Sequence, residues 1–220
     1  MRNSKQIPNT NAPMLQTTQI IIGTSNHHKF SEIEKILLPD EIGIKLVFGG
    51  DANSEPPEET GKDFFENAFI KAQFYSKITG LPAIADDSGL AVAALDGAPG
   101  IFSARYAGEG CTYADNNRKL LALLKDIPDN RRSAKFICTA VLYMPDGTNH
   151  SALGILEGRI NHSPRGTGGF GYDPVFEIAD GRTVAELPSD EKNLISHRAK
   201  SFMQMRGILT VLFVRTPDSK

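Results

Sequence analysis

The stretch IADDSGLAV, at residues 84–92, decides the fold because it joins an apolar run to two adjacent carboxylates and a hydroxyl. Residues 83–85 predict a buried strand, DDSG predicts a turn, and residues 90–95 predict the next strand. Ligands of open α/β sheets bind beyond the carboxyl ends of the strands. We therefore expect a ligand site at Asp86 and Asp87, although DDSG is also typical of an ordinary solvated turn.

Strand and helix signals alternate on both sides of this stretch. Apolar and β-branched runs predict further strands at residues 19–24, 44–48, 134–143, 151–157 and 174–178. Helical spacing of apolar residues predicts helices that begin near Ser25 or Asn26, Thr60, Thr112 and Ser196. The turn PDGT joins two of the strands into a hairpin. The pattern predicts a mixed α/β sheet with a second lobe that carries the hairpin.

Length and composition limit the function. The 220 residues fit one domain, taken as residues 18–215, between a polar tail at residues 1–17 and a short tail at residues 216–220. A net charge of −2 provides no positive field for nucleic acid. No segment resembles a secretory signal or a membrane span, and Cys111 and Cys138 fit reduced thiols. We expect a cytoplasmic protein with a small-molecule ligand and no nucleic-acid or membrane partner.

Residues 23–29, GTSNHHK, gather hydroxyls, an amide and a lysine where a strand ends and a helix begins. Backbone N–H groups and the helix dipole at such a place attract phosphate. The segment is not a P-loop, because the second glycine and the Lys-Ser/Thr pair are missing. It predicts either a phosphate contact or an ordinary helix cap beside a surface lysine.

The glycine cluster GTGGFG, at residues 166–171, formally matches the dinucleotide motif G-x-G-x-x-G but lacks the helix that must follow it. Tyr172, Asp173 and Pro174 lead instead into a strand-like run. Glycines here allow the backbone to approach a base or a sugar, with Phe170 or Tyr172 as a stacking ring. A flexible β-loop is the alternative.

One more polar cluster, SDEKNLISHRAKS at residues 189–201, brings Lys192, His197 and Arg198 together around a predicted helix start. Such donors suit a purine carbonyl or phosphate oxygens. An exposed charged helix face would have the same composition.

Five motifs occur in one order along the chain: TSNHHK, EETGKDFFENAFIKA, LPAIADDSGLAVAALDGAPGIFSARYAG, RGTGGFGYDP and SHRAKS. Together they resemble the inosine/xanthosine triphosphate pyrophosphatases over about residues 19–212. The resemblance implies a two-lobed α/β fold around a long central mixed sheet flanked by helices, a homodimer and dependence on Mg²⁺. It also implies hydrolysis of ITP, dITP or XTP to the monophosphate and pyrophosphate, which cleanses the nucleotide pool.

The resemblance implies roles for single residues. Asp87 would be the general base and a metal ligand, and Glu59 would be the second metal ligand, with Glu58 as an open alternative because the loop alignment is ambiguous. The residues expected to bind substrate are Thr24, Ser25, Asn26, His27, His28, Lys29, Ser88, Phe170, Gly171, Tyr172, Asp173, Lys192, His197 and Arg198. Serine stands at position 25 where the family has glycine, so a tighter or shifted turn is expected there.

The implied chemistry is attack on the α-phosphorus by a water that Asp87 orients and deprotonates. Donors on His197, on Arg198 or on backbone N–H groups would face the C6 carbonyl of inosine or xanthosine and reject the amino group of adenine. Two alternatives stay open: a related pyrophosphatase for other modified nucleotides, and a nucleotide-binding sensor without catalysis.

Overall fold

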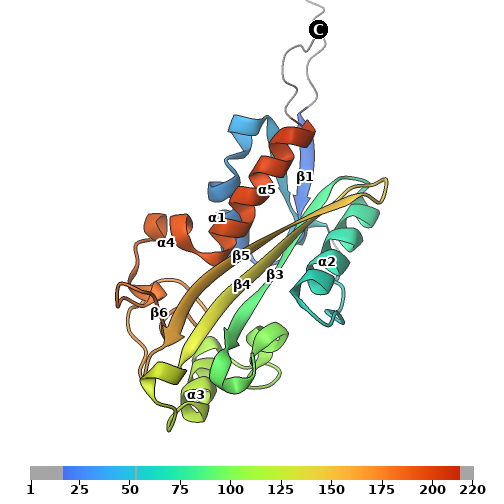
Figure 1. Cartoon of the computed structure of the whole chain (residues 1–220). Coiled ribbons are helices and arrows are strands. Elements are labelled where there is room, and N and C mark those ends of the chain that lie inside the picture. The colour runs from blue at the N-terminus through green and yellow to red at the C-terminus, as the bar shows by residue number, and fades with distance from the viewer. Residues whose placement is uncertain (1–16, 53, 214–220) are drawn as a thin grey trace, which may run out of the picture.

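The computed structural model describes residues 17–52 and 54–213, and its strands form one six-stranded sheet in the order β2-β1-β3-β4-β5-β6 (Figure 1). The strands are β1 (Thr18–Ile22), β2 (Ile44–Phe48), β3 (Ala83–Val92), β4 (Ser133–Tyr143), β5 (Asn149–Ile160) and β6 (Phe176–Glu177). β1 runs parallel to β2 and β3, and the remaining pairs are antiparallel. The expected mixed α/β sheet and its hairpin are confirmed.

Helices cover both faces of this sheet. The α-helices are α1 (His27–Leu37), α2 (Phe64–Thr79), α3 (Tyr113–Leu123), α4 (Ser189–Ile195) and α5 (His197–Phe213). Short 3-10 helices lie at Pro39–Ile42, Gly49–Asp51, Ala93–Leu95, Gly100–Arg105, Asp129–Arg131 and Val184–Glu186. Figure 1 shows α1 and α5 on one face and α2 on the other.

The apolar core is divided between the two ends of the long strands. One cluster packs α1 and α5 against β1 and one half of β4, with Ile20 and Phe202 fully buried. The other packs α3 and β6 against the opposite half, with Leu120 and Phe176 fully buried. β4 and β5 run through both clusters, which gives the two lobes that the resemblance implies.

The turn predicted at DDSG is wrong, because β3 passes through it without interruption. β4 pairs with β3 from Ala83 to Val92, so the backbone of the acidic residues belongs to a sheet ladder. Gly89 permits a close approach here, since a methyl group in its place would lie 2.5 Å from the Gly100 carbonyl oxygen. The predicted second strand is also wrong beyond Val92, where a 3-10 helix follows.

The helix starts were predicted in part. The capping box of Thr112 with Asp115 is confirmed, and the Ser196 hydroxyl caps α5 by accepting a backbone N–H (3.1 Å). The cap predicted at Thr60 is wrong, because the carboxylate of Asp63 accepts a first-turn N–H of α2 (2.8 Å). A carboxylate at this position also complements the helix dipole.

Two expectations reach beyond the described residues. The predicted tails at residues 1–17 and 216–220 lie there except for Thr17, and so do residues 214 and 215 of the predicted domain. Within the described part of the chain, none of the helices has the length and apolar character that a membrane crossing requires.

An open sheet edge appears where β1 stops short of β3. β1 pairs with β3 only at Ala83 and Ile84. The chain then turns away after Gly23, whose N–H still donates to the Ile84 carbonyl oxygen (2.7 Å). In the described sheet, the next residues of β3 have no strand on this side, so Asp86 and Asp87 lie at an edge that a ligand can reach.

Gly154 of β5 lets α5 lie directly on the sheet. A methyl group at this position would meet the His197 carbonyl oxygen and would lie 2.5 Å from the Ser201 nitrogen. Both are backbone atoms, so the helix itself would have to move. Because α5 begins with His197 and Arg198, this glycine helps to set where both side chains lie.

We expect Gly154→Ala to lower the free energy of unfolding by about 1–3 kcal/mol, because the added methyl group overpacks the contact between strand and helix. The matched control is Gly207→Ala in α5, where no atom lies within 4 Å of the added methyl group and alanine favours the helix by up to about 1 kcal/mol. Urea unfolding measures both changes. A Gly154→Ala protein as stable as the wild type would contradict the proposed packing constraint.

Candidate active site

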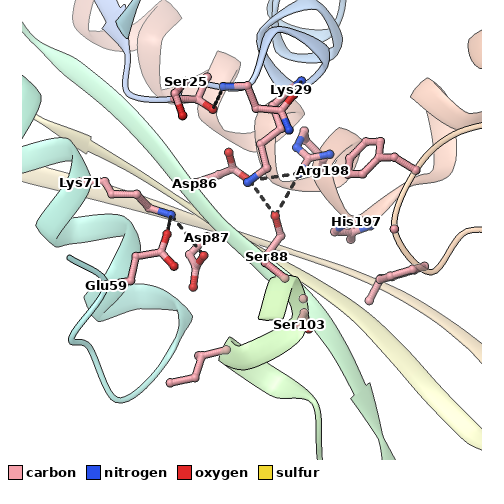
Figure 2. A pocket seen from close by; sticks show the side chains of 18 of the residues that line it. Ser25, Lys29, Glu59, Lys71, Asp86, Asp87, Ser88, Ser103, His197 and Arg198 are labelled. Carbon is pink, nitrogen blue, oxygen red and sulfur yellow. Dashed lines mark hydrogen bonds and ion pairs between the residues drawn. The ribbon is translucent and has the colours of Figure 1, made fainter. Parts of the chain in front are cut away.

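A cavity of about 430 Å³ opens at the free edge of β3 (Figure 2). Its volume is in the range of small-molecule and cofactor sites. It brings together residues from all five motifs and Lys192: Thr24, Ser25, Asn26, Lys29, Glu59, Asp87, Ser88, Phe170, Gly171, Tyr172, Asp173, Lys192, His197 and Arg198. The motifs therefore meet in one place, while the binding roles of their residues stay predictions.

The turn before α1 forms one wall of the cavity. The side-chain oxygen of Asn26 accepts from the N–H groups of His28 (2.9 Å) and Lys29 (3.2 Å) and so caps the helix. The Thr24 hydroxyl in turn accepts from the Asn26 N–H (3.1 Å). The cap places the Lys29 side chain beside the acidic residues of β3.

Ser25 does not require the backbone of a glycine. Among the non-glycine residues that the structure describes, only Leu38 and Asp96 have a positive φ. The tighter or shifted turn expected from serine at this position is therefore not needed to avoid left-handed strain.

His27 and His28 are not among the residues that line the cavity. The His27 ring stacks on Phe48 with a centroid distance of 4.2 Å, and the His28 side chain is exposed. His28 contributes its backbone N–H to the Asn26 cap. The two side chains therefore lie away from the cavity, while the predicted substrate contacts of His27 and His28 stay predictions.

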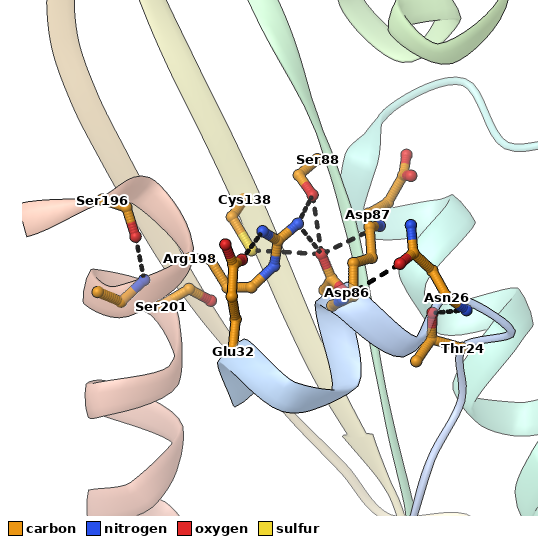
Figure 3. Close-up of polar contacts among 12 residues, drawn as sticks. Thr24, Asn26, Glu32, Asp86, Asp87, Ser88, Cys138, Ser196, Arg198 and Ser201 are labelled. Atoms are coloured by element: carbon orange, nitrogen blue, oxygen red, sulfur yellow. Dashed lines mark hydrogen bonds and ion pairs between the residues drawn. The ribbon is translucent and has the colours of Figure 1, made fainter. Parts of the chain in front are cut away.

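Asp86 is the centre of a buried ion-pair network on the α1 and α5 face (Figure 3). Its carboxylate accepts from Lys29 Nζ (3.5 Å), Ser88 Oγ (2.8 Å) and Arg198 Nη2 (3.3 Å). Burial alone would raise the pKa of Asp86, but Lys29 and Arg198 hold it well below its ordinary value. Asp86 therefore acts as a charged anchor that positions two cations.

Glu32 extends this network towards α4. Its carboxylate accepts from Arg198 Nη1 (2.7 Å) and Lys192 Nζ (3.0 Å), and Lys192 also pairs with Asp173 (3.0 Å). Burial disfavours the charge on Lys192, but Asp173 and Glu32 raise its pKa. Cations and carboxylates thus alternate in the order Lys29, Asp86, Arg198, Glu32, Lys192 and Asp173.

A second cluster lies on the α2 face of the sheet (Figure 2). Lys71 Nζ donates to Glu59 (2.6 Å) and Asp87 (3.2 Å), while Asn67 donates to the other oxygen of Asp87 (3.2 Å). Burial raises the pKa of Asp87, and the Lys71 ammonium opposes that rise. Glu58 is exposed and does not line the cavity, so position favours Glu59 between the two neighbouring glutamates.

His197 stacks on the ring of Phe136, with a centroid distance of 4.8 Å. Burial, together with Arg198 and Lys192, lowers the pKa of His197 well below its ordinary 6.5, so the imidazole is neutral at pH 7. In the described residues, His197 Nδ1 and Arg198 Nε are buried without a hydrogen-bond partner. Both residues therefore have hydrogen-bonding capacity that the described residues leave unused.

Phe170 lies beside the cations of the same network. Its ring centroid is 4.7 Å from Lys192 Nζ and 5.7 Å from the guanidinium carbon of Arg198. Tyr172 is buried instead, and its hydroxyl donates to the Ser103 carbonyl oxygen (2.9 Å). Of the two rings considered for stacking, Phe170 is therefore better placed.

Two charged residues of the site were not identified from the motifs. Lys71 lies between Ala68 and Ala72 on the buried face of α2, and a lysine on an apolar helix face is a signal that sequence analysis can use. Glu32 gave no comparable signal, because its partners lie on α4 and α5, far away in the sequence.

His197→Phe is expected to weaken the acid sensitivity of the fold while keeping a ring against Phe136. Below pH 6.5 the unfolded chain binds a proton at His197 that the folded chain excludes, so the wild-type protein loses stability as pH falls. The difference in the free energy of unfolding between His197→Phe and the wild type should therefore change in favour of the variant by about 1.4 kcal/mol per pH unit below pH 6.5. Urea unfolding between pH 5 and pH 7 measures it, with His150→Phe as the control. Parallel pH dependences for His197→Phe and wild type would show that His197 is not a neutral buried group.

The sequence and the fold both match one known family. The model of the Ham1 family matches residues 20–208. A dITP/XTP pyrophosphatase from Streptomyces coelicolor is 49% identical over 198 residues, which cover 89% of this chain and 98% of the relative. A dITP/XTP pyrophosphatase from Escherichia coli K12 is 46% identical over 186 residues, which cover 83% of this chain and 93% of the relative.

Solved structures agree with this relationship. A HAM1 protein from Coxiella burnetii has a TM-score of 0.82 and 43% identity, covering 88% of this chain and 99% of its own. A nucleoside-triphosphatase / dITP/XTP pyrophosphatase from Mycobacterium abscessus has a TM-score of 0.72 and 41% identity, covering 89% of this chain and 100% of its own. The resemblance in the motifs is confirmed, and the chain belongs to the Ham1 family.

Proposed function

We propose that this protein hydrolyses non-standard purine nucleoside triphosphates, namely ITP, dITP and XTP, to the monophosphate and pyrophosphate. The observation that carries the proposal is one cavity with two chemically different parts. Carboxylates and lysines suited to phosphate chemistry surround Asp87, whereas an aromatic ring and buried donors surround His197. The names of the relatives, dITP/XTP pyrophosphatases, support the same substrates.

The phosphate part of the cavity lies between α1 and α2. Lys29 and Lys71 offer positive charge to the triphosphate from the two faces of the sheet, and the turn at residues 24–26 offers hydroxyls and an amide. Both lysines are already paired with carboxylates, so they stay positioned before the substrate binds.

The donor set at this end fits Mg²⁺. Glu59 and Asp87 supply the hard carboxylate oxygens that Mg²⁺ prefers. No group of three or more His, Cys, Asp or Glu residues able to hold a metal occurs in the described chain, and two carboxylates suit an ion that keeps waters and takes phosphate oxygens. We propose these two residues as its ligands; bound there, the ion would neutralise the triphosphate and polarise its oxygens.

Asp87 is proposed as the general base. Its carboxylate takes a proton from a water, whose oxygen attacks the α-phosphorus as the bond to the bridging oxygen of the β-phosphate breaks. Pyrophosphate leaves with the electrons of that bond, and the nucleoside monophosphate remains. A raised pKa suits Asp87 to this task, because a stronger base accepts the proton more readily.

Base selectivity is proposed to arise at His197 and Arg198. Both line the cavity, and His197 Nδ1 and Arg198 Nε lack partners in the described residues. N–H groups from these residues would satisfy a carbonyl oxygen at C6, whereas the amino group of adenine would leave donors facing donors. Such a mismatch can lower the catalytic efficiency for the adenine nucleotide by a factor of roughly 10⁴. Phe170 would stack on the base.

We also propose that the enzyme is a cytoplasmic homodimer. Large apolar side chains such as Leu153 and Met203 are exposed on the adjoining β5 and α5, where a second copy can cover them. Free thiols at Cys111 and Cys138 suit a reducing compartment. Light scattering of the purified protein tests the assembly, and a monomer at micromolar concentration would contradict it.

Product analysis tests the proposed function. With Mg²⁺, the wild-type protein should convert ITP to IMP and pyrophosphate, XTP likewise, and ATP far more slowly. A chelator should abolish turnover. Release of IDP and orthophosphate would reject the pyrophosphatase reaction, and nucleotide binding without any product would identify the protein as a sensor.

We expect Asp87→Asn to reduce kcat for ITP by roughly 10²–10⁴-fold, because the amide cannot take the proton from water. The side chain keeps its shape, so the fold should persist. Asp126→Asn, at an exposed position outside the cavity, is the matched control and should retain activity. Steady-state release of pyrophosphate measures both. Turnover at the wild-type rate in Asp87→Asn would exclude Asp87 as the base.

A further inference from the structure

An aromatic residue of α3 lines the cavity although no motif pointed to it. Tyr113 is the first residue of α3, and 49% of it is exposed. Its ring centroid lies 6.1 Å from that of Phe170, with an angle of 40° between the rings. Tyr113 therefore offers a half-exposed ring to a flat ligand. This ring lies next to that of Phe170, which is proposed to stack on the base.

The backbone that carries Tyr113 is held firmly. The preceding residue, Thr112, caps α3: its hydroxyl accepts from the Asp115 N–H (3.2 Å), and the Asp115 carboxylate accepts from the Thr112 N–H (3.0 Å). This capping box fixes the first turn of the helix. The position of the Tyr113 ring is therefore set by a helix and not by a loose loop.

A second contact ties α3 to the glycine-rich loop. The side-chain amide of Asn117 donates to the Gly171 carbonyl oxygen (3.0 Å), and Asn117 is buried. Gly171 directly follows Phe170, whose own N–H donates to the Asp173 carboxylate (2.9 Å). Hydrogen bonds within the start of α3, within the glycine-rich loop and between these two segments thus hold the rings of Tyr113 and Phe170 near each other.

We propose that Tyr113 is a substrate-binding residue that stacks with Phe170 against the purine of the nucleotide. The inference rests on the proposed function and names a specificity-determining residue for it. Lys192 Nζ and the guanidinium carbon of Arg198 lie over the Phe170 ring, 4.7 Å and 5.7 Å from its centroid, so a base that stacks on this ring lies close to both donors. Tyr113 would then cover the aromatic surface that the base still exposes, and it would favour large flat bases over small ones.

Binding measurements separate this role from general effects on the site. The ligands are inosine 5′-(α,β-methylene)triphosphate, which cannot release pyrophosphate, and inorganic tripolyphosphate, which has no base. Tyr113→Ala should weaken binding of the nucleotide analogue by about tenfold, the loss of one base stacking on an aromatic ring. It should leave binding of tripolyphosphate unchanged. Tyr113→Phe keeps the ring and should bind both ligands like the wild type.

The matched control is Leu123→Ala, which truncates another half-exposed apolar side chain of α3 outside the cavity. It should bind both ligands like the wild type. Nuclear magnetic resonance adds a structural readout, because stacking shifts the base protons H2 and H8 upfield. The shift should be kept in Tyr113→Phe and reduced in Tyr113→Ala. Equal affinities of wild type and Tyr113→Ala for the analogue, or an equal loss for analogue and tripolyphosphate, would overturn the proposal.

These measurements do not depend on turnover. A wild-type protein that binds the analogue but releases no pyrophosphate from ITP would reject the proposed function, while the stacking role of Tyr113 would still be decided by the two affinities. A wild-type protein that turns over ITP with Tyr113→Ala unchanged in analogue affinity would reject Tyr113 and leave the proposed function intact.

Discussion

The ion pair between Asp86 and Arg198 is the interaction on which the site depends. It joins the middle of β3 to the first turn of α5, and both partners are almost fully buried. An unpaired charge at this depth would be very costly, so each partner requires the other. Glu32 and Lys29 complete the neutralisation from α1. The same contacts that make the charges tolerable therefore also hold three chain segments around the cavity.

Local patterns were sufficient for most of the fold. Helix faces and the PDGT hairpin depend on neighbouring residues, so their periodicity and turn chemistry predict them well. DDSG failed because its turn propensity is local, whereas the ladder with β4 that overrides it is formed by residues about 50 positions away. The cap at Thr60 failed for a different reason, since Asp63 offers a competing oxygen closer to the helix.

The sequence predicted which residues belong to the candidate site more completely than it predicted the contacts among them. The motifs located Asp87, Lys192 and Arg198, because carboxylates and donors beside strand ends and helix starts suggest nucleotide chemistry. They did not reveal that Asp86 is an internal counter-ion or that Lys71 links Asp87 to Glu59. Ion pairing joins residues from separate segments and leaves no periodic trace in a single sequence. The imidazoles of His27 and His28 show the reverse, since they share a motif with Lys29 but do not line the cavity.

The pleat of β3 gives two neighbouring residues different partners. Asp86 contacts α1 and α5, whereas Asp87 contacts α2, because successive residues of a strand point to opposite faces. A single inserted or deleted residue in this strand would exchange the two faces and give each helix the wrong carboxylate. The length of β3 is thus constrained as strictly as its composition. A change in chain length is better tolerated at residues 145–148 of the hairpin tip, which are exposed where the chain reverses between β4 and β5.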